Sequence, residues 1–133
     1  TFTDSKLQWE RAKTGSHGAL RAFYRALLRL RRELPALAWL DNASLNAAVI
    51  APTVLELRRW CDESRVVAWL NVSAEPAEAV VKLESGFWRK QLDAAEPVWG
   101  GAGSALPTTL LAVETALVLP PYAVAVYAAE PGA

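Results

Sequence analysis

The segment Ser16–Leu37, SHGALRAFYRALLRLRRELPAL, is strongly amphipathic. At about 100° per residue, its large apolar side chains share one broad arc of a helical wheel and most of its arginines share the opposite arc. The apolar arc holds Leu20, Phe23, Tyr24, Leu27, Leu28, Leu30 and Leu34, and the polar arc holds Arg21, Arg25, Arg29 and Arg32. This pattern predicts one long helix whose apolar side must be covered by another part of the protein.

Both ends of this helix carry recognisable signals. Ser16 is of the residue type that caps a helix N-terminus, and Pro35 disfavours helical backbone at Leu34. Arg31 interrupts the apolar arc, lying at about 20° from its centre on the wheel. We expect Arg31 to pair with a carboxylate on the surface that the helix packs against.

The chain after the helix consists of short β-branched runs separated by Gly, Pro, Asn and Asp. Strands are predicted at Ala47–Ala51, Thr53–Trp60, Arg65–Val72, Ala79–Leu83, Trp88–Asp93, Leu110–Val113, Thr115–Leu119 and Ala123–Ala128. Cys61–Ser64 is the predicted turn between the second and third of them. The fold class is therefore mainly β: an antiparallel, Greek-key-like sandwich of seven to eight strands, preceded by one long amphipathic α-helix.

This arrangement leaves open which surface packs against the apolar arc of the helix. The two sheets of a sandwich bury their inner faces against each other, so those faces are not available to a helix. Residues 1–37 are expected to form one part and residues 38–133 the sandwich. The apolar arc must then pack on an outer sheet face or on a partner absent from this chain.

Composition narrows the class of protein. A chain of 133 residues with 53% hydrophobic residues can bury one core, and 14 basic residues balance 14 acidic ones. This balance predicts no nucleic-acid partner. Cys61 stands alone, which excludes an internal disulfide and leaves a small buried residue or a reactive thiol. With no apolar run near 20 residues, we expect no membrane contact and a soluble, cytoplasmic protein.

Catalytic and cofactor motifs are missing from the sequence. His17 is a lone histidine, so no metal site and no cofactor are expected. The glycine-rich stretch Gly100–Ser104 lacks the Gly-Lys-Ser/Thr ending of a phosphate-binding loop. The carboxylates are scattered among turns and strand faces, and nothing places two of them across a cleft. No catalytic residue is predicted in this chain.

Six tryptophans are the most unusual feature of the composition. They are Trp9, Trp39, Trp60, Trp69, Trp88 and Trp99. Trp69 shares a strand face with Val67 and is expected to lie between the sheets. Trp60, Trp88 and Trp99 fall at strand ends or in loops, where partial exposure is expected. They either complete the core or offer flat faces to an α-glucan.

Several motifs resemble the C-terminal part of the α-amylase superfamily of glycoside hydrolases, and within it the trehalohydrolases. The more specific ones are TFTDSKLQW and LRAFYRALLRLRRELPAL, and the others are VVAWLNVS, WRKQLDAAEPVWGG and LPPYAVAVY. The resemblance implies a helix from the outer ring of a catalytic (β/α)8 barrel, followed by a sandwich. It also implies that the catalytic carboxylates lie on barrel strands missing from this chain.

This resemblance assigns expected roles to particular residues. The barrel interface is expected at Leu20, Phe23, Leu27, Leu30 and Arg31, and the border of a sugar site at Asp4, Ser5 and Lys6. The chain would be a non-catalytic domain that stabilises the barrel of an enzyme cleaving the α-1,4 bond next to a terminal trehalose. The alternative is an α-glucan-binding module that uses exposed tryptophans. Without its barrel, the chain is expected either to fold the helix onto the sandwich or to self-associate through it.

Overall fold

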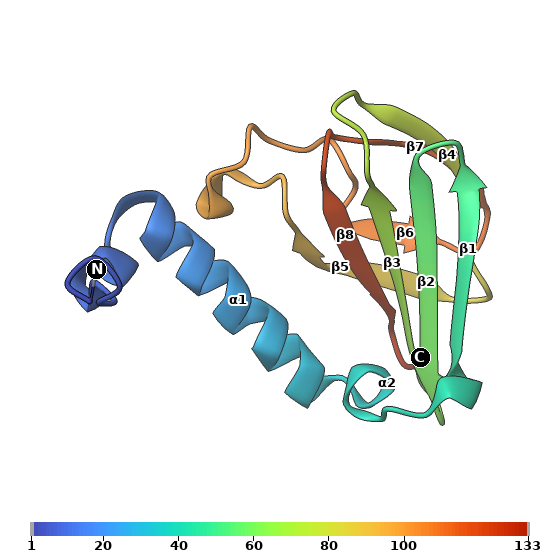
Figure 1. The fold of residues 1–133 in the computed structure, drawn as a ribbon. Helices are drawn as coiled ribbons and strands as arrows, with labels where there is room; N and C mark the ends of the chain where they lie inside the picture. The colour runs from blue at the N-terminus through green and yellow to red at the C-terminus, as the bar shows by residue number, and fades with distance from the viewer. Residues whose placement is uncertain (1, 133) are drawn as a thin grey trace.

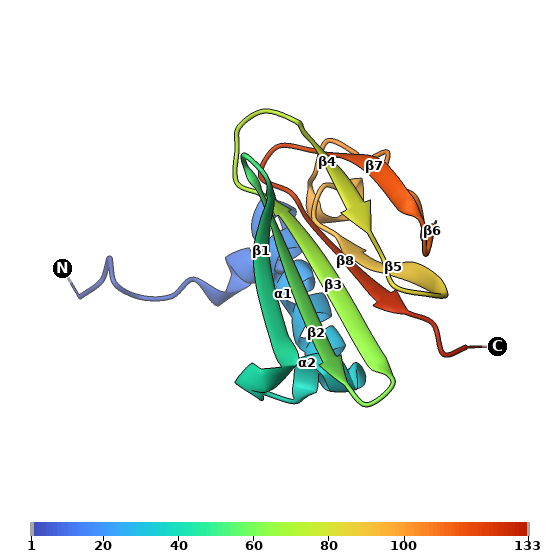
Figure 2. The same cartoon turned by 90° about the vertical axis from the view of Figure 1, so that its right-hand side faces the viewer.

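The computed structural model describes residues 2–132, which form a two-layered β-sandwich with a long helix beside it. Figures 1 and 2 show the helix, α1, running diagonally along the outer face of the larger sheet. Helical segments are η1 (Trp9–Lys13), α1 (Gly15–Glu33), α2 (Pro35–Ala38), η2 (Asn42–Ser44) and η3 (Pro97–Trp99). The predicted fold class, a mainly antiparallel β-sandwich after one long helix, is confirmed.

Eight strands form the two sheets, and every pairing between them is antiparallel within the described residues 2–132. The strands are β1 (Leu45–Ala51), β2 (Val54–Cys61), β3 (Ser64–Asn71), β4 (Ala77–Lys82), β5 (Phe87–Asp93), β6 (Thr109–Leu111), β7 (Glu114–Leu119) and β8 (Val124–Ala129). The larger sheet has the order β1-β2-β3-β8-β5-β6, and β4 pairs with β7 in the smaller one. The chain changes sheet between β3 and β4, which makes the sandwich.

The main core lies between the two sheets. Trp69 and Tyr127 are fully buried there, with ring centroids 5.3 Å apart. The indole N–H of Trp69 donates to Oε2 of buried Glu56 at 2.8 Å, and Nε of Arg58 donates to Oε1 of the same carboxylate at 2.6 Å. The predicted burial of Trp69 between the sheets is confirmed, and the carboxylate that it contacts is paired rather than isolated.

A second apolar cluster joins α1 to the outer face of the larger sheet. Leu30 is buried there against β3 and β8, whose residues Val66 and Val126 point outward because side chains alternate along a strand. Strands β3 and β8 are therefore covered on both faces. Phe23 packs edge-on against Trp99 of η3, with ring centroids 5.6 Å apart, so this loop holds α1 from a second side.

The start of α1 differs from the sequence prediction. The helix begins at Gly15, with Thr14 as the N-cap residue, and Ser16 lies inside its first turn. The backbone N–H of Gly18 donates to the carbonyl of Thr14 at 3.0 Å, so the first helical turn begins two residues before the predicted cap, Ser16. The prediction that Ser16 is the N-cap residue was wrong. The other end is as predicted, because Leu34 is extended directly before Pro35.

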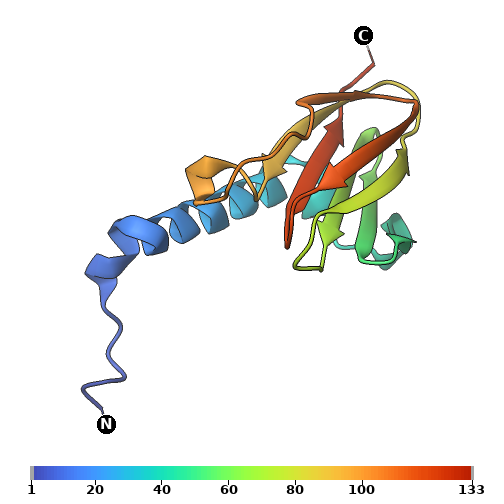
Figure 3. The same ribbon diagram turned by 90° about the horizontal axis from the view of Figure 1, so that it is seen from above.

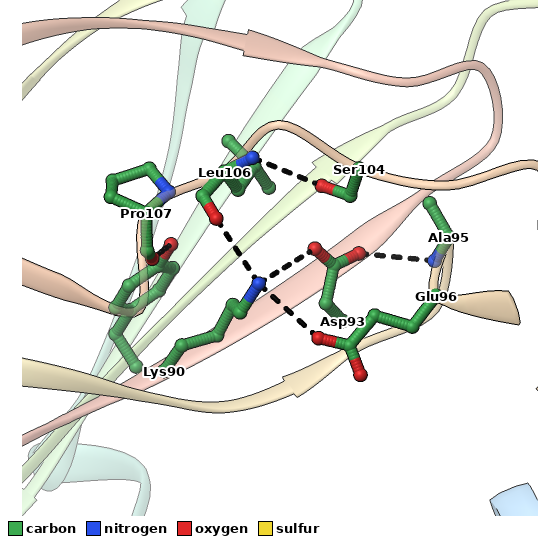
Figure 4. A network of polar contacts seen from close by, with 8 residues as sticks. Lys90, Asp93, Ala95, Glu96, Ser104, Leu106 and Pro107 are labelled. Carbon is green, nitrogen blue, oxygen red and sulfur yellow. Dashed lines mark hydrogen bonds and ion pairs between the residues drawn. The ribbon is translucent and has the colours of Figure 1, made fainter. Parts of the chain in front are cut away.

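The loop between β5 and β6 is held by a buried ionic network, shown in Figure 4. The ammonium of Lys90 lies 3.3 Å from Oδ2 of Asp93 and 3.2 Å from Oε1 of Glu96, and it donates to the carbonyl of Leu106 at 3.1 Å. Oδ1 of Asp93 accepts from the N–H of Ala95 at 3.0 Å. The network ties both ends of the loop to β5.

Tyr127 closes the same region and gives a pH-dependent prediction. Its hydroxyl donates to the carbonyl of Pro107 at 2.6 Å. Burial raises the pKa of this hydroxyl well above its ordinary value of about 10, and the nearby carboxylates of Asp93 and Glu96 raise it further. The folded chain therefore keeps a proton that the unfolded chain loses. The contribution of this group to the free energy of unfolding is fully present below about pH 10. It is lost as the pH rises towards the raised pKa.

Replacing this tyrosine isolates the effect. Wild type is expected to lose up to about 1.4 kcal/mol of unfolding free energy per pH unit above pH 10 through this one group, and Tyr127→Phe is expected to lose that much less. Urea unfolding at a series of pH values measures both slopes. Tyr24 and Tyr122 are present in both proteins, so any contribution from them cancels in the comparison. Equal slopes for the two proteins would show that the buried hydroxyl does not control alkaline stability.

Candidate functional site

The side of α1 away from the sandwich carries a row of exposed apolar residues. Leu20, Tyr24 and Leu28 are 53%, 59% and 56% exposed. Their spacing of four residues places them on one line along the helix. We call Leu20, Tyr24 and Leu28 the open row. The apolar arc of α1 is thus wider than the surface that the sandwich covers.

Arg31 continues the open row, and it has no carboxylate partner among residues 2–132. It is exposed, and with Leu28, Arg32 and Ala38 it lines a hollow of about 630 Å³ at the C-terminal end of α1. The pairing predicted for Arg31 therefore has no counterpart among the residues that the structure describes. A carboxylate on another surface stays a prediction.

Three of the residues predicted to face a barrel instead contact the sandwich. Leu30 is buried, and Phe23 and Leu27 are half-buried against the same cluster. The prediction that the whole arc faces an absent partner was wrong for these three, because the outer face of β3 and β8 supplies an apolar surface. Leu20 and Arg31 remain open.

The N-terminal segment extends past the start of α1, away from the sandwich, as Figure 3 shows. With the first turns of α1 it lines a hollow of about 450 Å³, to which Asp4, Lys6, Leu20 and Tyr24 contribute. The ammonium of Lys6 lies 5.5 Å from the ring centroid of Phe2, and Asp4 and Ser5 both take part in interactions within the chain. The three residues predicted to border a sugar site thus lie beside the open row.

The three tryptophans predicted to be partly exposed lie in different settings. Trp88 is only 2% exposed, and its indole N–H donates to the carbonyl of Glu84 at 3.2 Å. Of the two interpretations of this ring, core packing is confirmed and exposure is not, because Trp88 pairs with Leu110 and faces the core between the sheets. Trp99 is half-buried against Phe23. Trp60 is 40% exposed. Trp60 and Trp88 line the same hollow, whereas Trp99 lies apart from them against Phe23.

Trp60 lines a hollow of about 560 Å³ at one end of the sandwich, which we call the end hollow. Its other polar lining residues come from β1, from β2 with its following turn, from β3 and from the loop after β4: Asn46, Arg58, Arg59, Asp62, Arg65 and Glu84. Sequence reasoning found Trp60 and missed the others. The hairpin signal at Cys61–Ser64 could have found Arg65, because a two-residue turn places it directly opposite Trp60.

Two further findings concern chemistry and membranes. Within residues 2–132 no three His, Cys, Asp or Glu side chains come together in a way that could hold a metal ion. None of the described helices has the length and apolar character needed to cross a membrane. Cys61 is a half-buried free thiol.

The fold is shared with solved α-amylase-family enzymes. An α-amylase from H. orenii has a TM-score of 0.64 and 20% identity, over 92% of this chain and 22% of that one. Trehalulose synthase MutB from Pseudomonas mesoacidophila MX-45 has a TM-score of 0.55 and 23% identity, over 84% of this chain and 18% of that one. At such identities the likeness establishes the fold. The chain resembles one domain of these larger glycosidase-family proteins.

A curated relative makes the resemblance more specific. Malto-oligosyltrehalose trehalohydrolase from Rhizobium sp. (strain M-11) is 41% identical over 76 residues. The match takes in 57% of this chain but 12% of that relative, so the chain spans a small part of it. No family model matches. The resemblance to the α-amylase superfamily and to its trehalohydrolases, expected from the sequence, is confirmed.

Proposed function

We propose that this chain is the non-catalytic C-terminal domain of a trehalohydrolase-like glycoside hydrolase, and that it stabilises a catalytic (β/α)8 barrel. The whole enzyme would cleave the α-1,4 bond next to a terminal trehalose with two barrel carboxylates. The observation that carries the proposal is the open row on α1. One side of the helix packs on the sandwich, and the other side presents Leu20, Tyr24 and Leu28 to a neighbour.

Residues 1–37 would belong structurally to the barrel and residues 38–133 to the sandwich. Contacts across this boundary support a rigid connection: Ala36 is fully buried, and its N–H donates to the hydroxyl of Ser64 at 3.1 Å. A barrel that packs on the open row would therefore be fixed relative to the sandwich. Asp4, Ser5 and Lys6 would then lie at the edge of the barrel's sugar site.

The open row gives a direct test. Without its barrel, the chain at high concentration is expected to associate through the row, because three neighbouring large side chains form an exposed apolar patch. The triple variant Leu20→Lys, Tyr24→Lys, Leu28→Lys is expected to remain monomeric, with a free energy of unfolding within about 1 kcal/mol of wild type, since these are surface positions. Light scattering over a concentration series measures the association.

The control is Ala22→Lys, which adds one positive charge at an exposed position outside the row; it is expected to associate like wild type, and each single lysine variant of the row is compared with it. A wild-type chain that stays monomeric at every concentration would count against the row as an interface. Hydrolysis of maltooligosyl trehalose by the chain alone would contradict its non-catalytic role. Reading the upstream DNA separately tests whether a barrel is encoded in the same frame.

A further inference from the structure

Four of the residues that line the end hollow stand on one face of the larger sheet. Arg65 lies directly opposite Trp60, and Asn46 lies directly opposite Arg58. Directly paired residues share a face, and so do Arg58 and Trp60, which are two positions apart on β2. These four side chains therefore stand on the inner face of the larger sheet. They lie beyond the buried part that holds Glu56 and Trp69.

Two guanidinium groups in the end hollow are held by bonds within the chain. The guanidinium of Arg58 is held by Glu56 at 2.6 Å and by the carbonyl of Lys82 at 2.5 Å. The guanidinium of Arg65 donates to Oε2 of Glu84 at 2.7 Å. A ligand would therefore meet ordered donors and acceptors rather than mobile side chains, which lowers the entropy cost of binding.

Charge at this site is balanced. Both arginines on this face are paired with a carboxylate, Arg58 with Glu56 and Arg65 with Glu84. An anion would gain from the arginines and lose to the carboxylates. A neutral ligand that both accepts and donates hydrogen bonds meets no such conflict.

We infer that the end hollow is an α-glucan-binding site centred on Trp60. The apolar face of a glucose ring would pack on the exposed part of the indole, while its hydroxyls reach the guanidinium of Arg65, the carboxylate of Glu84 and the amide of Asn46. The choice of an α-1,4-linked chain among neutral sugars rests on the proposed function. The existence of the sugar site does not, because the end hollow and the open row share no residue.

Affinity electrophoresis in gels with and without amylopectin tests this inference on the whole chain. Wild type is expected to be retarded by the polysaccharide, and Trp60→Ala is expected to bind about tenfold more weakly or not at all. Trp9→Ala is the matched control, since Trp9 is an exposed tryptophan far along the chain from the end hollow, and it should migrate like wild type. Circular dichroism checks that each variant is folded.

A second variant keeps the test decisive if Trp60→Ala fails to fold. Glu84→Gln changes a side chain that is 60% exposed and removes one acceptor charge, so it should weaken retardation several-fold without unfolding the chain.

Calorimetric titration with maltoheptaose, cellohexaose and inorganic phosphate identifies the ligand. Maltoheptaose binding lost in both variants supports the site. Absent retardation of wild type, unchanged binding by folded Trp60→Ala, or binding of phosphate alone would overturn it. Binding of cellohexaose alone would leave a sugar site but contradict the assignment to α-glucans.

Discussion

Replacing Trp69 by alanine is expected to lower the free energy of unfolding by about 3–5 kcal/mol, because the largest fully buried side chain of the core would leave a cavity. The loss has a polar part as well. The indole N–H donates to Oε2 of Glu56 at 2.8 Å, so the variant leaves a buried carboxylate with one donor fewer. Urea unfolding followed by far-UV circular dichroism measures the change.

Two further variants separate the contributions to this loss. Trp69→Phe keeps a ring beside Tyr127 and removes the N–H, and we expect a loss of about 1–3 kcal/mol. Trp9→Ala removes a tryptophan that is exposed, and the change should stay within about 0.5 kcal/mol. If Trp69→Ala proved as mild as Trp9→Ala, the two sheets would not be held together through this side chain.

The strands were predictable because their alternation is regular. The second predicted strand, Thr53–Trp60, is observed as Val54–Cys61, and the third, Arg65–Val72, is observed as Ser64–Asn71. Trp69 was placed correctly for the same reason, since Val67 and Trp69 repeat with a period of two. A local pattern of this kind fixes which residues share a face. It does not tell which face is covered by a distant segment.

Trp88 shows where local reasoning fails. It lies one residue inside β5, and a place near a strand end suggested exposure, yet the ring faces the core opposite Leu110. Further along the strand, the register of β5 against β8 shifts between Lys90 and Leu92, so Leu92 belongs to the cluster under α1 although it is an even number of positions from Trp88. Such a bulge changes which side each later residue faces, and the sequence carries no clear sign of it.

The helix α1 shows the same limit at a larger scale. The helical wheel correctly identified the apolar arc of α1. It did not show which residues of the arc pack on the sandwich and which stay in the open row. Leu30 packs on the sheet and Leu28 does not, although both belong to one arc. The width of the sheet's outer face and the position of the η3 loop decide this division. Both depend on contacts between residues far apart in the chain.

The end hollow was only partly predictable, because it needs three separate strands and a loop. Trp60 was a candidate from its residue type alone. Arg65 follows from the hairpin register, but Glu84 comes from a loop nineteen residues after Arg65 in the chain. The pairing of Arg65 with Glu84 exists only once the two sheets have assembled.

Replacing Lys90 by methionine is expected to cost about 3–5 kcal/mol of stability, because it leaves the fully buried carboxylate of Asp93 without its ammonium partner. Lys90 is itself only 10% exposed, and it also contacts Glu96 and the carbonyl of Leu106. The loop between β5 and β6 would lose its anchor. Since Trp99 of this loop packs on Phe23, the attachment of α1 to the sandwich should loosen with it.

Hydrogen exchange resolves this sequence of effects. Lys90→Met is expected to speed exchange in the loop between β5 and β6 and in α1 more than in the paired strands β2 and β3. Lys82→Met is the matched control, because it removes an exposed lysine from β4, and its exchange should match wild type. Uniform acceleration over the whole chain would instead mean that the network stabilises the sandwich globally.

The double variant Lys90→Met, Asp93→Asn distinguishes a buried charge from a lost contact. Asparagine removes the uncompensated charge, while its carbonyl oxygen can still accept the N–H of Ala95 that Oδ1 of Asp93 accepts at 3.0 Å. If the cost of Lys90→Met comes mainly from the unpaired carboxylate, the double variant should be more stable than the single one. If it comes from the lost bond to Leu106, the second substitution should recover nothing. In the first case, the ion pair is what keeps the loop, and through it the helix that carries the open row, in position.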